Sequence, residues 1–169
     1  MSLVCLGLGS NADPHVPFGA CLDALEATFG ALKVSRVFES EPVGISSPTN
    51  FHNAVVAFES DWTPGALAAW AKAFEARHAG APAGGHRPKA LDIDLLSVGD
   101  TCARVDGITL PRPDITSCAF VLTPLAELLP DQCHPCCQTP YKTLFERADF
   151  SGQRLWPVAF RWRGVVLSP

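Results

Sequence analysis

Two aspartates carry the clearest chemical signal in this sequence. Residues 91–96 read LDIDLL, so Asp92 and Asp94 lie two positions apart within an apolar run. In a strand, side chains alternate between the two faces, so both carboxylates project from one face while the apolar residues between them enter the core. Their backbones would lie roughly 6–7 Å apart, which lets two carboxylates bridge two magnesium ions about 3.5–4 Å apart. Hard oxygen ligands of this kind suit magnesium and substrate phosphates, whereas an exposed strand face that carries two acids is the alternative.

Basic residues precede this strand. The segment from Gly80 to Pro88 is rich in glycine and proline, contains His86 and Arg87, and is followed by Lys89. Cations beside a metal site are what a polyphosphate needs, and a segment of this composition predicts a loop that can close. A solvated basic turn is the alternative.

The elements that must position these residues follow from periodicity. Their order is strand, helix, strand, strand, helix, strand, over residues 3–8, 18–29, 33–38, 51–59, 63 to about 79, and 91–96. A long loop covers residues 39–50. This order predicts an α+β protein with a ferredoxin-like βαββαβ core, in which helices pack on a mainly antiparallel sheet.

The remaining residues add smaller elements. A short strand is expected near residues 108–110, and helices over 119–128 and 141–148. Residues 154–167 read as a strand pair with Phe160 and Trp162 on one face and Arg161 and Arg163 on the other. Such a tail would cover a sheet edge or form a dimer contact, and a homodimer is therefore considered. A contribution of its arginines to the polyphosphate site is a further alternative.

Composition narrows the class of protein. The 169 residues are 47% apolar and 18% charged with a net charge of −4, which predicts a single globular domain over residues 1–169 and argues against nucleic acid or a membrane surface as partner. The apolar run at residues 3–8 has no basic region before it and is too short for a signal peptide, so the protein is expected in the cytoplasm.

The seven cysteines cannot all pair within one chain, and reduced thiols are expected. The segment Cys133 to Cys137 reads CHPCC. It could offer soft ligands to zinc, but four ligands within five residues close poorly around a tetrahedral ion, so a surface turn with free thiols is favoured.

Four segments together resemble a known family. They are LGLGSN at residues 6–11, FHNAVVAFE at 51–59, PKALDIDLL at 88–96 and LPRPDITSCAFVLTPLAELLP at 110–130. In this order they resemble 6-hydroxymethyl-7,8-dihydropterin pyrophosphokinase over about residues 3–146, which leaves residues 151–169 as a C-terminal extension. The resemblance implies a ferredoxin-like fold and, in folate biosynthesis, transfer of pyrophosphate from ATP to the hydroxymethyl group of the pterin with release of AMP. It also implies ATP as co-substrate and two Mg²⁺ ions on Asp92 and Asp94.

The resemblance also assigns substrate contacts by matching positions. Lys89 joins Asp92 and Asp94 in the catalytic set. The pterin would be held by the Asn53 side chain and by backbone around Ser40, Pro42 and Val43, with Phe51 and Phe120 on its two faces. Phe51 and Phe120 are alternatively plain core residues. The residues implied near the nucleotide are Lys72, Glu75, His86 and Thr109; Glu75 is alternatively a solvated acid.

Several family cations are replaced. Arg87 and Lys89 stand where the family signature has glycine and arginine, Arg112-Pro113 where it usually has His-Tyr, and Cys118 where a phosphate-binding arginine is usual. Arg87 and Arg112 are therefore hypothesised to take over triphosphate contacts, because each adds a guanidinium near the vacated region. The alternatives are a weakly active or non-catalytic pterin-binding paralogue, and a pyrophosphokinase for a different pterin.

Overall fold

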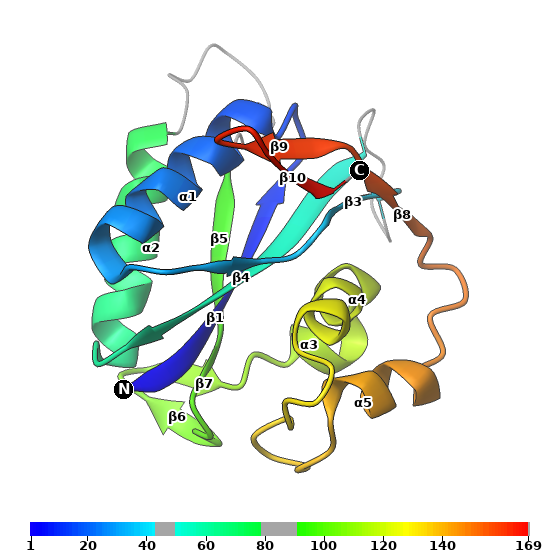
Figure 1. Cartoon of the computed structure of the whole chain (residues 1–169). Helices are drawn as coiled ribbons and strands as arrows, with labels where there is room; N and C mark the ends of the chain where they lie inside the picture. The colour runs from blue at the N-terminus through cyan, green and yellow to red at the C-terminus, as the bar shows by residue number, and fades with distance from the viewer. Residues whose placement is uncertain (43–49, 79–90, 169) are drawn as a thin grey trace, which may run out of the picture.

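The computed structural model describes residues 1–42, 50–78 and 91–168 (Figure 1). The first half of the chain alternates strands and helices: β1 (Ser2–Ser10), α1 (His15–Phe29), β2 (Lys33–Val34), β3 (Val37–Ser40), β4 (Phe51–Ser60), α2 (Pro64–His78) and β5 (Asp92–Val98). The second half contains β6 (Ala103–Val105), β7 (Ile108–Leu110), α3 (Asp114–Ser117), α4 (Ala119–Leu128), α5 (Tyr141–Arg147), β8 (Leu155–Val158), β9 (Phe160–Trp162) and β10 (Val165–Ser168). The predicted order of elements is confirmed, and β6 and α3 were not predicted.

The main sheet has the strand order β5-β1-β4-β3-β8, with β2 also paired to β4. Its pairs are antiparallel, as the ferredoxin-like prediction requires. The single strand expected at residues 33–38 is divided at Ser35. The Ser35 amide donates to the Val55 carbonyl oxygen at 2.9 Å, and its hydroxyl accepts from the Val55 amide at 2.8 Å. The Ser35 hydroxyl thus accepts the hydrogen bond that a backbone carbonyl oxygen would accept in a regular ladder, and this irregularity separates β2 from β3.

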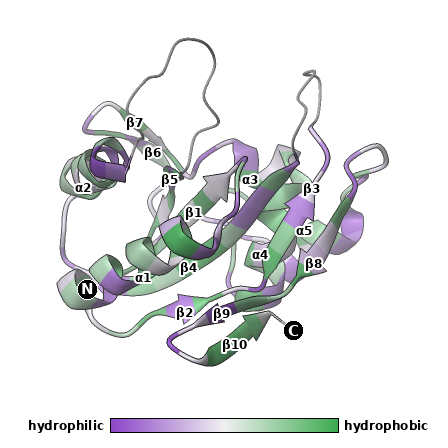
Figure 2. Cartoon of the chain, turned by 90° about the horizontal axis from the view of Figure 1, so that it is seen from above, coloured by the Kyte–Doolittle hydropathy of each residue, from purple (hydrophilic) through white to green (hydrophobic). Residues whose placement is uncertain are grey.

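Two layers of helices cover the sheet. Helices α1 and α2 lie on one face, and α4, with α3 and α5, lies on the other (Figures 1 and 2). Helix α1 begins at His15, three residues before the predicted start, because Pro17 falls in the first turn, where a missing N–H costs no hydrogen bond. In β1, Leu6 and Leu8 belong to the α1–α2 core, whereas Cys5 belongs to the α4 core. Gly7 and Gly9 therefore face the α4 side.

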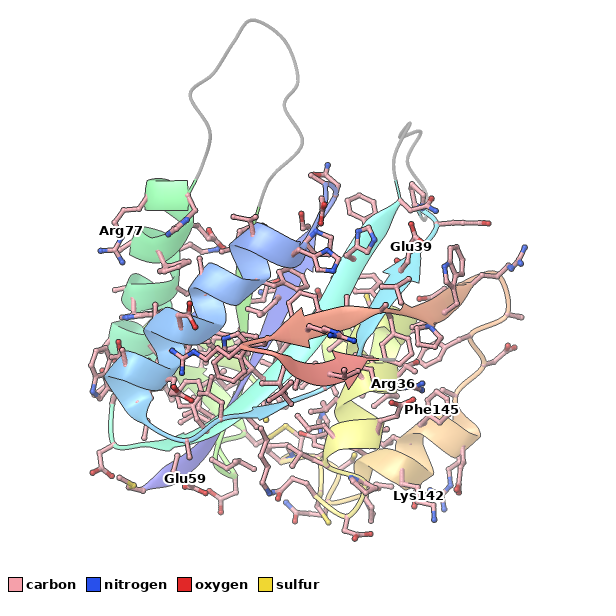
Figure 3. All side chains as sticks on the ribbon, turned by 45° about the horizontal axis from the view of Figure 1, so that its top comes forward. Arg36, Glu39, Glu59, Arg77, Lys142 and Phe145 are labelled. Atoms are coloured by element: carbon pink, nitrogen blue, oxygen red, sulfur yellow. A yellow bond between two sulfur atoms is a disulfide. The ribbon has the colours of Figure 1, made fainter. Side chains whose placement is uncertain are left out.

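An ion pair helps to hold α4 against the sheet. Arg36 follows β2 and donates through Nε and Nη2 to the two carboxylate oxygens of Glu127 in α4, at 2.9 and 2.6 Å (Figure 3). The Arg36 guanidinium also lies over the Phe38 ring, 5.2 Å from its centroid. The loop between the two short strands is thus tied to α4, the helix that carries Phe120.

The C-terminal segment covers the free edge of β3. Strand β8 pairs with β3 from Val37 to Ser40, so the expectation that the tail covers a sheet edge is confirmed. Strands β9 and β10 form a hairpin over α1, where Phe160 is buried and stacks on His15 at a centroid distance of 5.3 Å. The prediction that Arg163 points away from Trp162 is wrong. Arg163 lies in the turn at φ 51°, over the Trp162 ring, and both side chains donate to Asp23.

The prediction of reduced thiols throughout is also wrong. Cys102 and Cys136 form a disulfide that joins the turn after β5 to the segment between α4 and α5. The remaining five cysteines are free. The free-thiol interpretation of the Cys133–Cys137 segment therefore fails at Cys136, because folding brings together two residues separated by 34 positions. Within the described ranges, no group of three or more histidine, cysteine or acidic side chains could hold a metal ion. No helix there is long and apolar enough to span a bilayer.

Candidate active site

Two glycines form the floor of a hollow on the α4 face of the sheet. In the strand register, Gly9 of β1 lies between Asp92 of β5 and Asn53 of β4. Gly7 lies in the same way between Asp94 and Val55. The hollow is lined by Gly7, Leu8, Gly9, Asn53, Ala54, Val55, Asp92, Asp94, Leu96, Phe120 and Val121. Its lining combines apolar side chains with a few polar groups, as small-molecule sites do.

Side chains at the two glycine positions would meet different neighbours. A Cβ atom at Gly9 would lie 3.1 Å from Asn53 Oδ1 and 3.8 Å from Asp92 Cβ. A Cβ atom at Gly7 would lie 3.5 Å from the nearest Leu96 methyl group, which is ordinary contact. Gly9 therefore keeps Asn53 and Asp92 accessible from the same side.

The two aspartates project into the hollow together, as their spacing predicts. The pKa of Asp94 is raised, first by burial and then by the charge of Asp92, while Arg112 and Lys72 act in the opposite direction. A bound cation would relieve this repulsion, so the donor set fits a divalent metal ion. Because the carboxylates form only a pair among the described residues, the other ligands would be phosphate oxygens and water, as magnesium prefers.

Arg112 supplies positive charge beside this pair. Its backbone amide donates to the Leu96 carbonyl oxygen at 2.8 Å, which fixes the residue against β5. Its guanidinium lies between two carboxylates, with Nη2 3.8 Å from Asp94 and Nε 3.2 Å from Asp114. The structure therefore places Arg112 at the carboxylate end of the hollow, and its contact with ATP stays a prediction.

Helix α2 contacts the outer edge of β5, the strand that carries Asp92 and Asp94. Strand β5 ends the sheet, and the Ile93 amide, between the two aspartates, donates to Glu75 Oε1 at 2.5 Å. Lys72 Nζ lies 3.3 Å from both Glu75 oxygens. Glu75 is thus more than a solvated acid: it binds the backbone that carries Asp92 and Asp94, a role that the sequence pattern did not reveal.

Two of the residues predicted to hold the pterin, Asn53 and Phe120, line the hollow. Ser40 of β3 lies opposite Phe51 of β4 in the pairing of these two strands. A second, smaller hollow is lined by Ser40, Ala119, Phe120, Gln153, Arg154 and Leu155, so Phe120 borders both spaces. Phe51 is half-buried and belongs to neither buried cluster of the described residues, which argues against its being plain core.

The other predicted site residues are placed differently. Pro42 is half-buried two residues after the end of β3. Thr109 is exposed on the hairpin of β6 and β7 and is not among the residues that line the hollow. Val43, His86, Arg87 and Lys89 lie outside the described residues, as does the predicted loop at 80–88.

The fold and the hollow define a ferredoxin-like α+β protein whose site suits transfer of a phosphoryl group between a metal-bound polyphosphate and a flat polar ligand. Residues 5–130 match the family model for 7,8-dihydro-6-hydroxymethylpterin-pyrophosphokinase (HPPK), and the chain belongs to this family. The resemblance of the four sequence segments is thereby confirmed.

The similarity to known proteins covers most of the chain. The 2-amino-4-hydroxy-6-hydroxymethyldihydropteridine pyrophosphokinase of Porphyromonas gingivalis is 35% identical over 147 residues, covering 83% of this chain and 99% of that protein. The enzyme of the same name from Pseudomonas aeruginosa is 32% identical over 131 residues, covering 76% and 81%. The wild-type HPPK-DHPS of Plasmodium falciparum with pteroate superimposes with a TM-score of 0.67 at 12% identity, covering 86% of this chain and 44% of that one. At this identity, the superposition supports the fold alone.

Proposed function

We propose that this protein transfers pyrophosphate from ATP to the hydroxymethyl group of 6-hydroxymethyl-7,8-dihydropterin and releases AMP, a step of folate biosynthesis. The observation that carries the proposal is the convergence of Asp92, Asp94, Asn53 and Phe120 on one hollow with a glycine floor. The relatives that share the family bear the name of this activity. Family membership and the polar lining of the hollow thus support the same chemistry.

The reaction depends on positioning. The pterin hydroxyl must approach the β-phosphorus of ATP in line with the departing AMP oxygen, and no covalent protein intermediate is required. The Asn53 amide can both donate to and accept from the pterin ring, while Phe51 and Phe120 offer apolar faces to it. Ser40, Pro42 and Val43 would hold the ring through backbone groups.

Charge neutralisation is the second requirement. When bound at Asp92 and Asp94, two magnesium ions would neutralise the phosphate oxygens and favour attack at phosphorus. Arg112 would add charge-assisted hydrogen bonds to the triphosphate from its place beside Asp94. Lys89, His86 and Arg87 would approach the nucleotide from the preceding segment, and Lys72, Glu75 and Thr109 stay predicted nucleotide contacts. A cytoplasmic location and a homodimer likewise stay predictions from the sequence.

One incubation tests the proposal. Purified protein with ATP, magnesium and 6-hydroxymethyl-7,8-dihydropterin should release AMP and pterin diphosphate in equal amounts. Asp94→Asn should abolish this release, because the amide loses the charge that binds a cation, whereas Asp100→Asn, at an exposed position after β5, should leave it intact. Pterin binding without AMP would instead indicate the non-catalytic paralogue. AMP release with a different pterin only would indicate the altered substrate.

A further inference from the structure

The side chain of Gln153 joins α3 to α4, the helix that carries Phe120. Its Nε2 donates to the Ser117 carbonyl oxygen at 3.2 Å, and its Oε1 accepts from the Ala119 amide at 2.9 Å. Gln153 lies 34 positions beyond Ala119 and outside residues 5–130, which match the family model. The C-terminal segment therefore contributes a polar group directly to the region next to Phe120.

The two hydrogen bonds span a break in the helix. Helix α3 ends at Ser117 and α4 begins at Ala119, while Cys118 between them is extended, with φ −115° and ψ 118°. The first amides of a helix have no partner within it, and the Cys118 side chain caps none of them. Gln153 satisfies the Ala119 amide and the last carbonyl before the break, and so fixes the direction in which α4 leaves Cys118. Phe120 is the next residue.

Strand pairing holds Gln153 in place. Two residues later, β8 begins and pairs with β3, with Leu155 opposite Ser40 and Trp156 opposite Glu39. The Trp156 indole N–H also donates to Glu39 Oε2 at 2.9 Å; Glu39 is labelled in Figure 3. Gln153, Arg154 and Leu155 line the smaller hollow together with Ser40 and Phe120. One short segment thus connects β3 with the first turn of α4.

We propose that Gln153 is a positioning residue for the pterin ligand, which it serves by fixing Phe120 relative to Ser40. The inference rests on the proposed function, because Ser40 and Phe120 are the pterin contacts assigned there. In this assignment Gln153 acts through Phe120 and not through a contact of its own with the ligand. Its removal should therefore weaken pterin binding more than ATP binding or the chemical step.

The test compares three variants by steady-state kinetics. Gln153→Ala should raise the KM for the pterin about fivefold to tenfold, the size expected for the loss of these two hydrogen bonds, one partly buried and one exposed, and leave kcat and the KM for ATP within about twofold. Gln153→Glu, which keeps the acceptor for the Ala119 amide, should give an intermediate KM. Gln132→Ala makes the same substitution at an exposed position between α4 and α5 and should match the wild type.

A double-mutant cycle with Phe120→Ala separates positioning from general stability. If Gln153 acts through Phe120, Gln153→Ala should add little to the pterin KM of Phe120→Ala, whereas independent effects multiply. An unchanged pterin KM, or equal losses in both KM values and kcat, would overturn the assignment of Gln153. Failure of the wild type to bind or convert the pterin would overturn the proposed function and this inference with it. If Gln153→Ala does not fold, the same comparison rests on Gln153→Glu.

Discussion

Replacement of Gly9 by alanine should change ligand binding much more than the free energy of unfolding. The new Cβ atom would lie 3.1 Å from Asn53 Oδ1, closer than ordinary contact, so the amide of Asn53 must move by a few tenths of an ångström. In a strand, alanine is otherwise favoured over glycine by roughly 0.5–1 kcal/mol, because a chain with alanine loses less conformational entropy on folding than one with glycine. The two effects oppose each other, and we expect the free energy of unfolding to change by less than about 1 kcal/mol.

Ligand binding should respond much more strongly. A displaced Asn53 amide loses one or two hydrogen bonds to the pterin, each worth about 0.5–1.5 kcal/mol, so the KM for the pterin should rise about tenfold. The KM for ATP should change little. Urea unfolding and steady-state kinetics with each substrate varied in turn measure the two quantities on the same protein.

Gly7→Ala is the matched control, since it makes the same change on the same face of β1. Its Cβ atom meets a Leu96 methyl group at 3.5 Å and displaces no polar group, so the pterin KM should change by less than about threefold. Equal effects of the two variants would show that the volume of the hollow, and not the position of Asn53, determines binding. An unchanged pterin KM in Gly9→Ala would refute the placement of Asn53 in the pterin site.

Three further predictions concern charge and burial. Arg112→Ala should raise the KM for ATP about 10- to 150-fold with little change for the pterin, because charge-assisted phosphate bonds are lost; an unchanged KM for ATP would remove the hypothesis. Glu75→Ala leaves the Ile93 amide without its acceptor, so it should lower the free energy of unfolding measured in urea by about 1–3 kcal/mol and should also lower kcat. Glu75→Gln retains an acceptor and should recover most of the stability and of kcat. Wild-type stability and kcat in Glu75→Ala would contradict this role of Glu75. Burial raises the pKa of the Cys5 thiol from 9.0 to about 11. The unfolded chain therefore releases this proton first, and up to about 3 kcal/mol of stability, present below pH 9, should be lost as the pH rises to 11. Cys5→Ala should flatten this alkaline slope in urea unfolding, and an unaltered slope would contradict the assignment.

Much of the fold follows from local sequence. The limits of α4 and the start of β4 agree with prediction, because α4 has apolar residues at helical spacing and β4 contains a continuous apolar run. The division between β2 and β3 could not be predicted, because it depends on a hydrogen bond between distant residues. The Ser35 hydroxyl, in place of a backbone carbonyl oxygen, accepts from the Val55 amide of β4. The pairing of Cys102 with Cys136 was missed for a similar reason: spacing along the chain says nothing about proximity in the folded protein.

For the site, the sequence alone determined which side chains share a face. Strand alternation places Asp92 and Asp94 together, and the glycines of LGLGSN together, whatever the surrounding fold. Only the tertiary structure decided that Gly9 lies between Asp92 and Asn53, that Glu75 binds the strand between the aspartates, and that Gln153 binds the Ala119 amide next to Phe120. Periodicity is a property of neighbouring residues, whereas strand register and hydrogen bonds between distant segments depend on how the whole core packs.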